Sequence, residues 1–176
     1  SSVMFDGSSL PIEENIAVSK TIGDFCRACD VSFEVEVVCV AYNDPGKVVE
    51  ERLTLPQDVV AMCEGAKVDC IAVAVGNVHK MIEQKAVIDF DLLSRVQASS
   101  SVPLVIHGSS GIPDDQVEKM QEYGIGKMNI GTAVRMAFGN TLREFAQENP
   151  DVFDRIKLVQ KPMEEMRKVI EVKYQK

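Results

Sequence analysis

Residues 102–113 read VPLVIHGSSGIP, an apolar run that ends in His107 and passes straight into a turn rich in glycine and serine. Residues 69–79, DCIAVAVGNVH, repeat this plan, with an apolar run, a short turn and then His79. Continuous apolar runs this short, closed by turn residues, are typical of strands that are buried on both faces of a parallel sheet. Both stretches therefore predict parallel strands with polar residues at their carboxyl ends.

The rest of the chain alternates predicted strands and helices around these two runs. Further strands are predicted over residues 2–6, 31–40 and 126–130. Apolar residues at helical spacing predict helices over residues 11–29, 56–64, 91–98 and 114–123, then two or more helices from residue 132 with a break near residues 149–154. In the first of these helices, the spacing assigns Phe25 to the apolar face. Polar stretches predict loops over residues 42–55 and 78–87. This alternation indicates βα units around a parallel sheet, in a single α/β domain over residues 1–176.

Composition and charge exclude several classes of protein. The 176 residues carry a net charge of −8. Because an acidic chain repels phosphate backbones, we expect no nucleic-acid partner. No apolar run reaches the ~18 residues of a membrane span, and the first residues, SSVMFDGSS, lack the basic and apolar regions of a signal peptide. We therefore expect no membrane association and a cytoplasmic location.

The cysteines agree with that location. There are five, an odd number, and they lie among apolar neighbours, which is typical of reduced thiols in a cytosol. Cys26 and Cys29 form a C-x-x-C pair, for which two interpretations stay open. We favour buried cysteines near the end of a helix over a redox pair, because a redox motif would open a helix.

The two histidines of the chain are candidate metal ligands. Each follows a predicted strand, and the carboxyl ends of parallel strands meet at one rim of a sheet or barrel. Imidazole nitrogen is a common zinc donor, and catalytic zinc takes three protein ligands and keeps one open position. We therefore predict a Zn²⁺ site at this rim. Its third donor is Glu34, Glu36, Asp6, a cysteine or a residue outside this sequence.

Two turns at the same rim are candidate phosphate sites. Residues 108–111 follow the strand that ends in His107, and residues 129–132 follow the last predicted strand. Glycine lets the backbone approach a ligand, and consecutive N–H groups or a helix N-terminus favour an anion. Each turn alone would be read as an ordinary strand-to-helix turn. The two together, beside the histidines, favour a phosphate site.

Two architectures fit these patterns, a doubly wound open sheet and a (β/α)8 barrel. A barrel usually needs about 250 residues, so chain length alone favours the open sheet. Five segments nevertheless resemble the class II, zinc-dependent ketose-bisphosphate aldolases: SSVMFDGSSLPIEENI, VSFEVE, DCIAVAVGNVH, VPLVIHGSSGIP and GIGKMNIGTAVRMAF. The resemblance implies a (β/α)8 TIM barrel, represented here by about its last five strands and the C-terminal helices, without the N-terminal strands.

The resemblance also implies an activity, a lyase of glycolysis. A class II aldolase cleaves a ketose 1,6-bisphosphate to dihydroxyacetone phosphate and glyceraldehyde 3-phosphate, with zinc polarising the ketone. Fructose 1,6-bisphosphate is the preferred substrate, and tagatose bisphosphate is the alternative. A monovalent cation is a further cofactor that the family allows, and its members are commonly dimers or tetramers.

Residue roles follow from the same resemblance. It makes His79 and His107 zinc ligands, and it places Asp6 and Glu34 in a neighbouring second-metal region. The substrate phosphate would be held by the two turns, whose members are Gly108, Ser109, Ser110, Asn129, Ile130, Gly131 and Thr132. Lys80 is a further candidate, because the family has glycine there and a lysine would either contact phosphate or obstruct it.

Other departures from the family leave the function open between alternatives. The family's upstream histidine and its acid–base aspartate have no counterpart here, and residues 42–51 replace a glycine-rich loop with a catalytic glutamate that neither Glu50 nor Glu51 aligns with. The chain is expected to be part of a longer aldolase or a truncated, non-catalytic paralogue that binds sugar phosphate. A Schiff-base aldolase using Lys80 or Lys127 is a third, weaker interpretation, because such a lysine needs an apolar pocket.

Overall fold

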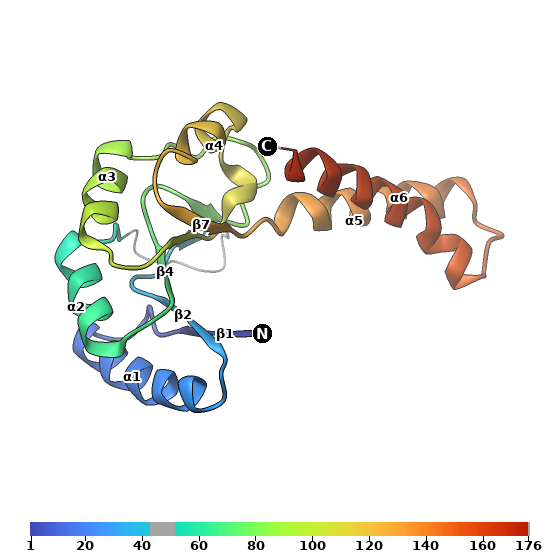
Figure 1. Ribbon diagram of the computed structural model, residues 1–176. Helices are drawn as coiled ribbons and strands as arrows, with labels where there is room; N and C mark the ends of the chain where they lie inside the picture. Colours follow the sequence, from blue (N-terminus) through green and yellow to red (C-terminus); the bar gives the residue numbers. More distant parts are fainter. Residues whose placement is uncertain (43–51, 176) are drawn as a thin grey trace. The chain divides into compact units, whose positions relative to one another are not determined.

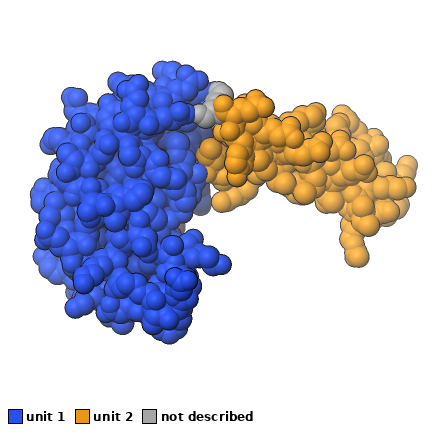
Figure 2. All heavy atoms as spheres, viewed as in Figure 1, with its two compact units in different colours: residues 1–129 blue, residues 130–176 orange. Residues whose placement is uncertain are grey.

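The structure is a computed structural model that describes residues 1–42 and 52–175. Its contacts divide the chain into two compact units, residues 1–129 and residues 130–176 (Figure 2). Most of the loop predicted over residues 42–55, with Glu50 and Glu51, lies outside the described residues. No helix in the described ranges has the length and apolar character needed to cross a membrane.

The first unit is built on a parallel sheet of five strands (Figure 1). In spatial order they are β1 (Ser2–Asp6), β2 (Ser32–Glu36), β4 (Cys70–Val73), β6 (Leu104–Ile106) and β7 (Ile125–Met128). Each strand is added beside the previous one, whereas the strand order of a doubly wound sheet reverses at a switch point. The open doubly wound sheet that length alone favoured is therefore wrong, and the winding is that of a βα-barrel segment.

Four helices and a short helical turn connect these strands. They are α1 (Ile12–Ala28), α2 (Pro56–Ala66), α3 (Phe90–Ser99), the 3-10 turn η1 (Ser109–Gly111) and α4 (Asp114–Met120). A second sheet joins β3 (Ala41–Tyr42) to β5 (Val78–His79) in parallel. The segment predicted as a loop over residues 78–87 thus begins with a short strand, which fixes His79.

The strand predicted over residues 31–40 is only half as long in the structure, because β2 ends at Glu36. Beyond it the Val40 N–H donates to the Glu36 carboxylate, at 3.3 Å from Oε1. That contact draws the backbone back towards the end of β2, so the β-branched residues that follow Glu36 leave the strand. The strand β2 therefore ends at Glu36, a residue of the candidate site described below.

The two faces of the main sheet carry different residues. The face that we call the helix face packs against α1, α2 and α3, and its residues are Phe33, Val35, Ile71, Val73, Leu104 and Ile106, all buried. The opposite face, the site face, carries Glu34 beside Cys70, Glu36 beside Ala72, and Lys127 beside Val105. Alternate residues of one strand point to opposite faces, so both faces are made by the same strands.

Helix α1 corrects two sequence expectations. Cys26 is buried against the helix face, as expected, but Cys29 is exposed at the C-cap, so the pair is not buried together. Phe25, which was assigned to the apolar face of this helix, is 71% exposed. The buried stripe of α1 is narrower than the apolar spacing suggested, because small and polar residues such as Asn15 and Ser19 occupy part of it.

The second unit is a pair of helices, α5 (Thr132–Glu148) and α6 (Arg155–Tyr174). The break predicted near residues 149–154 is confirmed, and Asp154 caps α6 by accepting a hydrogen bond from the Ile156 N–H at 2.9 Å. An aspartate at the N-cap satisfies a backbone donor that would otherwise lack a partner.

Candidate metal centre

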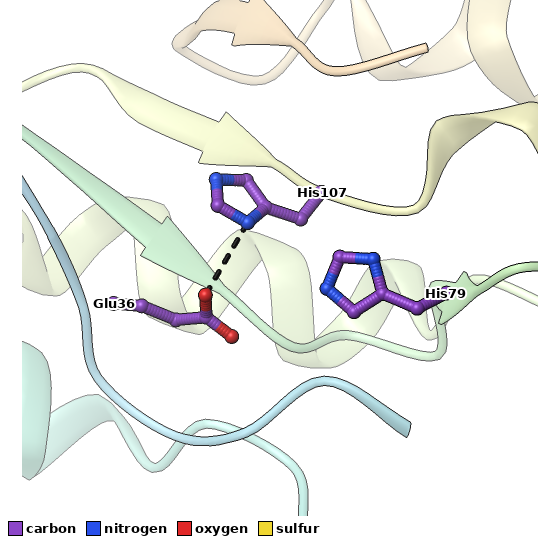
Figure 3. Close-up of side chains that lie close together, drawn as sticks. All are labelled: Glu36, His79 and His107. Atoms are coloured by element: carbon purple, nitrogen blue, oxygen red, sulfur yellow. Dashed lines mark ion pairs between the residues drawn. The ribbon is translucent and has the colours of Figure 1, made fainter. Parts of the chain in front are cut away.

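Three side chains from separate elements meet at the carboxyl end of the sheet (Figure 3). Glu36 is the last residue of β2, His79 ends β5, and His107 directly follows β6. One donor atom of each lies within 4.8 Å of a donor atom of the others. Among the described residues this is the one group of three or more histidine, cysteine or carboxylate side chains close enough to hold a metal ion.

Both ring nitrogens of His107 contact carboxylates. Nδ1 lies 3.3 Å from Glu36 Oε2, and Nε2 lies 2.9 Å from Glu34 Oε1. Burial alone would lower the pKa of His107, but the hydrogen bonds and charges of Glu34 and Glu36 outweigh it and raise the pKa to about 9. Without a metal, His107 is therefore a cation held between two carboxylates at neutral pH.

Glu34 forms the second part of this network. Burial would raise the pKa of Glu34, but its hydrogen bonds to His107 and Lys127 lower the pKa below the usual value. The Lys127 ammonium pairs with Glu34 Oε2, and the Cys70 thiol donates to the same oxygen at 3.8 Å. Burial and the nearby Glu34 charge raise the pKa of the Cys70 thiol to about 11. Without a metal, Cys70 is therefore a protonated neighbour of Glu34.

Two buried asparagines fix the backbone that carries the metal-binding side chains. Asn77 Nδ2 donates to the His107 carbonyl at 2.9 Å, and its Oδ1 accepts from the Val75 N–H at 2.8 Å. On the other side, Asn15 Nδ2 donates to the Glu36 carbonyl at 2.9 Å. Each amide ties the end of one strand to another element, so Glu36 and His107 are held by the fold as well as by each other.

Gly108 is required for the approach of the two histidines. Its φ is +65°, and a Cβ there would lie 2.6 Å from the Val78 carbonyl oxygen and 2.9 Å from the His79 nitrogen. Only glycine admits β5 so close to the turn after β6. As a result the rings of His79 and His107 pack edge to face, with centroids 5.8 Å apart.

The two turns predicted to bind phosphate differ in their place in the fold: η1 lies within the first unit, whereas residues 129–132 span the boundary between the two units. In η1, the Ser109 N–H donates to the Asn129 carbonyl at 3.2 Å, and the Ser109 hydroxyl donates to the Ile106 carbonyl at 2.9 Å. Both donors of Ser109 are therefore used within the fold. Asn129 closes the first unit, while Ile130, Gly131 and Thr132 open the second, with Gly131 as the N-cap of α5.

The other predicted site residues lie outside the three-residue cluster. Asp6 accepts hydrogen bonds from the N–H and hydroxyl of Ser8, at 3.1 Å and 2.5 Å, and so stabilises its own turn. Glu34 contacts His107 from the side away from Glu36. Lys80 adopts a φ of +57°, a region that glycine favours, at the position where the resemblance expects glycine.

A hollow of about 550 Å³ opens beyond the carboxyl ends of β1 and β2. Its lining comes from three segments, which contribute Ser8, Ser9, Leu10, Pro11, Ile12, Val37, Val38, Arg52, Leu53, Leu55 and Asp58. Burial, followed by the nearby charge of Glu13, raises the pKa of Asp58, and Arg52 opposes this rise. The hollow offers a cation and hydroxyl groups at the same end of the sheet as the cluster.

Sequence reasoning missed the roles of Asn15, Asn77 and Lys127 in this network. For Lys127 a signal existed, since a lysine inside a predicted strand of a parallel sheet, whose faces are usually covered, needs a counter-charge on its face of the sheet. Glu34 and Glu36 supply such a charge at spacing two. For the asparagines the sequence gives no comparable signal.

Comparisons with known proteins identify a matching family model and similar solved structures. A family model described as fructose-bisphosphate aldolase class-II matches residues 1–176. The crystal structure of the YdjI aldolase from Escherichia coli K12 is 29% identical, with a TM-score of 0.73, and the match covers 95% of this chain.

Two further solved structures share the fold. A putative fructose-1,6-biphosphate aldolase from Coccidioides immitis has a TM-score of 0.80 at 24% identity over 97% of this chain. The fructose-bisphosphate aldolase (Fba) from Campylobacter jejuni has a TM-score of 0.78 at 24% identity over 99% of this chain. The chain spans only 56%, 60% and 58% of these three structures in the order given, which is consistent with part of a (β/α)8 barrel.

Proposed function

This chain belongs to the class II fructose-bisphosphate aldolase family, and we propose that it serves the metal-dependent aldol cleavage of a ketose 1,6-bisphosphate, with fructose 1,6-bisphosphate as the preferred substrate. The products are dihydroxyacetone phosphate and glyceraldehyde 3-phosphate, and the reverse condensation follows by the same route. The observation that carries the proposal is the meeting of Glu36, His79 and His107 at the carboxyl end of the sheet.

These three residues fit Zn²⁺ by the chemistry of their donors. Two imidazoles and one carboxylate, with a fourth position left open, form a ligand set of catalytic zinc. The three come from different elements whose ends are fixed by Asn15, Asn77 and Gly108, so the donors are brought together before any ion binds. When bound, zinc supplies a Lewis acid that polarises the substrate ketone.

The chain's own residues prepare this centre. The proton that His107 carries between the two carboxylates must leave before Nδ1 can act as a ligand, since a metal ligand must be deprotonated. Glu36, whose carboxylate contacts Nδ1, would then be one of the residues that hold the cation. Because the site lies at the carboxyl ends of parallel strands, the substrate reaches it from the rim at which barrel enzymes bind their ligands.

Substrate orientation is assigned to the two turns. In the first unit, Gly108, Ser110 and Asn129 are proposed from the family resemblance to hold one phosphate of the substrate, which would orient its carbonyl towards the metal. The engaged donors of Ser109 support a role in shaping the turn. Lys80 is proposed to contact phosphate, because its cationic side chain follows His79 directly.

The protein is further proposed to act as a homo-oligomeric, single-domain enzyme of the cytoplasm. An odd number of cysteines lying among apolar neighbours, five in this chain, is typical of a reducing compartment. A dimer or tetramer is proposed from the family.

The test is the release of dihydroxyacetone phosphate from fructose 1,6-bisphosphate by the full chain, with added Zn²⁺ and then with a chelator. We expect turnover that the chelator abolishes and that Cys29→Ser, an exposed control variant, retains. Faster release from tagatose 1,6-bisphosphate would reassign the preferred substrate. Binding of either bisphosphate by a folded protein that never cleaves it would favour the non-catalytic alternative.

A further inference from the structure

We propose that Glu34 and Lys127 form a positioning pair that orients the His107 ring for the metal, and that Glu34 is not itself a metal ligand. This inference rests on the proposed function, because it takes the site of Glu36, His79 and His107 as given. It revises the second-metal role that the resemblance suggested for Glu34, and it gives Lys127 a task other than that of a Schiff-base nucleophile.

The orientation of His107 follows from its two contacts. Nε2 lies 2.9 Å from Glu34 Oε1, and Nδ1 lies 3.3 Å from Glu36 Oε2. Figure 3 shows His107 with one nitrogen turned to Glu36 and the ring beside that of His79. While Nε2–H donates a hydrogen bond to Glu34 Oε1, Nδ1 is the nitrogen left for the metal. A carboxylate that holds the second nitrogen of a histidine ligand fixes both its tautomer and its ring angle.

Glu34 can do this because each of its oxygens has a separate partner. Oε1 contacts His107, while Oε2 accepts from the Lys127 ammonium and from the Cys70 thiol. The carboxylate plane is thereby fixed from both sides. To reach a metal, Glu34 would have to give up these contacts, and a metal held by Glu36, His79 and His107 does not require that.

Lys127 reaches Glu34 across the sheet. Glu34 lies beside Cys70 on β4, and Lys127 lies beside Val105 on β6, so two strands separate the partners. A flat sheet would place their strands roughly 14 Å apart at ~4.8 Å per spacing. Their neighbours on this face, Cys70 and Val105, carry no charge. The side chain of Lys127 is 46% exposed, whereas that of Glu34 is 5% exposed.

The charges explain why a lysine is needed there. Glu34 and Glu36 are buried carboxylates on one face, and both contact the His107 ring. A buried carboxylate without a counter-charge is unfavourable. The Lys127 ammonium pairs with Glu34 Oε2 and supplies a positive charge on this face. It therefore holds Glu34 in the position from which Oε1 contacts His107 Nε2.

The experiment measures metal affinity, which does not depend on turnover. The full chain and its variants are titrated with Zn²⁺ against a chromophoric chelator, and the Co²⁺ form is examined by visible absorption. The variants are Glu34→Gln, Lys127→Met and Lys127→Arg. Lys168→Met is the matched control, because Lys168 pairs with Glu165 on α6, outside the first unit. Circular dichroism and thermal melting show that each variant is folded.

We expect Glu34→Gln to weaken Zn²⁺ binding by about 10- to 100-fold, the usual effect of losing a residue that orients a metal-binding histidine. Lys127→Met should weaken it by roughly tenfold, Lys127→Arg should restore it, and Lys168→Met should leave it unchanged. The Co²⁺ spectrum should keep its intensity in every variant that binds Co²⁺, because the ligand set is the same.

Zn²⁺ affinities of Glu34→Gln and Lys127→Met equal to that of the wild type would overturn the inference while leaving the metal centre intact. A lower coordination number in the Co²⁺ spectrum of Glu34→Gln would overturn it by making Glu34 a ligand.

If Lys127→Arg bound Zn²⁺ as weakly as Lys127→Met, the positive charge at residue 127 would not explain the loss of affinity, and the role given to Lys127 would be overturned. If Glu34→Gln did not fold, the half-exposed Lys127 would still carry the test. A folded wild-type chain that binds no metal would remove the proposed function as well.

Discussion

The helix face and the site face of the main sheet are built by the same strands, yet they differ in almost every physical respect. On the helix face, Phe33 and Val35 pack among apolar side chains and are almost fully buried. On the site face, Glu34 and Glu36 stand one residue away and are nearly as buried, but each depends on a charged partner. Burial alone therefore does not separate core from site.

The difference shows how the strands serve two purposes at once. Burial of apolar area on the helix face stabilises the unit. Burial of carboxylates on the site face is unfavourable unless each is paired, and here His107 and Lys127 provide the pairing. We expect substitutions on the helix face to change stability first and substitutions on the site face to change metal binding and activity first.

The largest effect on stability is expected from Phe33→Ala on the helix face. Phe33 is 1% exposed, and truncation of a buried phenylalanine typically lowers the free energy of unfolding by about 3–5 kcal/mol. Urea denaturation followed by circular dichroism measures the loss. Phe25→Ala is the matched control, since Phe25 is 71% exposed and should lose under about 1 kcal/mol. Equal losses in both variants would contradict the assignment of the helix face.

His79→Ala should have the opposite effect to Phe33→Ala, with a large loss of activity and a small loss of stability. The ring lies at the rim of the sheet, where its exposure is intermediate, so the free energy of unfolding should change by no more than about 1 kcal/mol. Zinc-dependent cleavage should fall by at least about a hundredfold, because Lewis-acid stabilisation contributes several kcal/mol. Steady-state kinetics with parallel urea denaturation measures both quantities. Unchanged cleavage would remove His79 from the metal centre.

The pH dependence of stability in the metal-free protein tests the charge pairing on the site face. Contacts with two carboxylates raise the pKa of His107 from 6.5 to about 9 on folding. A group whose pKa rises on folding stabilises the folded state fully below its unfolded pKa, and this contribution is lost as the pH rises through the folded value. The chelator-treated protein should therefore lose stability between about pH 6.5 and pH 9.

Urea denaturation of the chelator-treated protein at a series of pH values measures this loss. His107→Gln should flatten the profile over the same range, because it removes the titrating group. A wild-type profile that is already flat would mean that His107 is not held as a cation by Glu34 and Glu36.

The smallest effect is expected from Lys80→Gly, next to His79. Lys80 has a φ of +57°, a left-handed conformation that is strained for any residue with a Cβ. Glycine removes this strain but also raises the conformational entropy of the unfolded chain. The net result should be a gain of about 0.5–1 kcal/mol in the free energy of unfolding. Lys80→Ala keeps the strain and is the control. Thermal melting of both variants checks the prediction, and a glycine variant no more stable than the alanine variant would show that the backbone is not strained there.

The sequence predicted the helix face well. The apolar positions of β2, β4 and β6 follow from short continuous runs, and the placement of His79 and His107 at one rim follows from their positions after predicted strands. These features depend on local pattern, which a sequence displays directly. Phe25 was assigned wrongly, because the spacing of apolar residues on α1 does not reveal how wide a stripe the sheet covers.

The site face was harder to predict, because its contacts depend on register between distant strands. Glu34 and Glu36 are equivalent in the sequence, and only the alignment of β2 with β4 and β6 decides which one faces His79. The pair of Glu34 with Lys127 joins residues that are 93 positions apart. The approach of β5 to Gly108 depends on a close backbone contact that periodicity does not encode.

The most direct test of the metal centre is to locate zinc by anomalous diffraction at its absorption edge in crystals of the protein grown with Zn²⁺. We predict one strong peak bonded to Glu36, His79 and His107, at about 2.0–2.2 Å from each donor atom, with Glu34 still bonded to His107 Nε2. A peak bonded to Glu34 or Asp6 in place of Glu36, or no peak near the two histidines, would contradict the proposed centre.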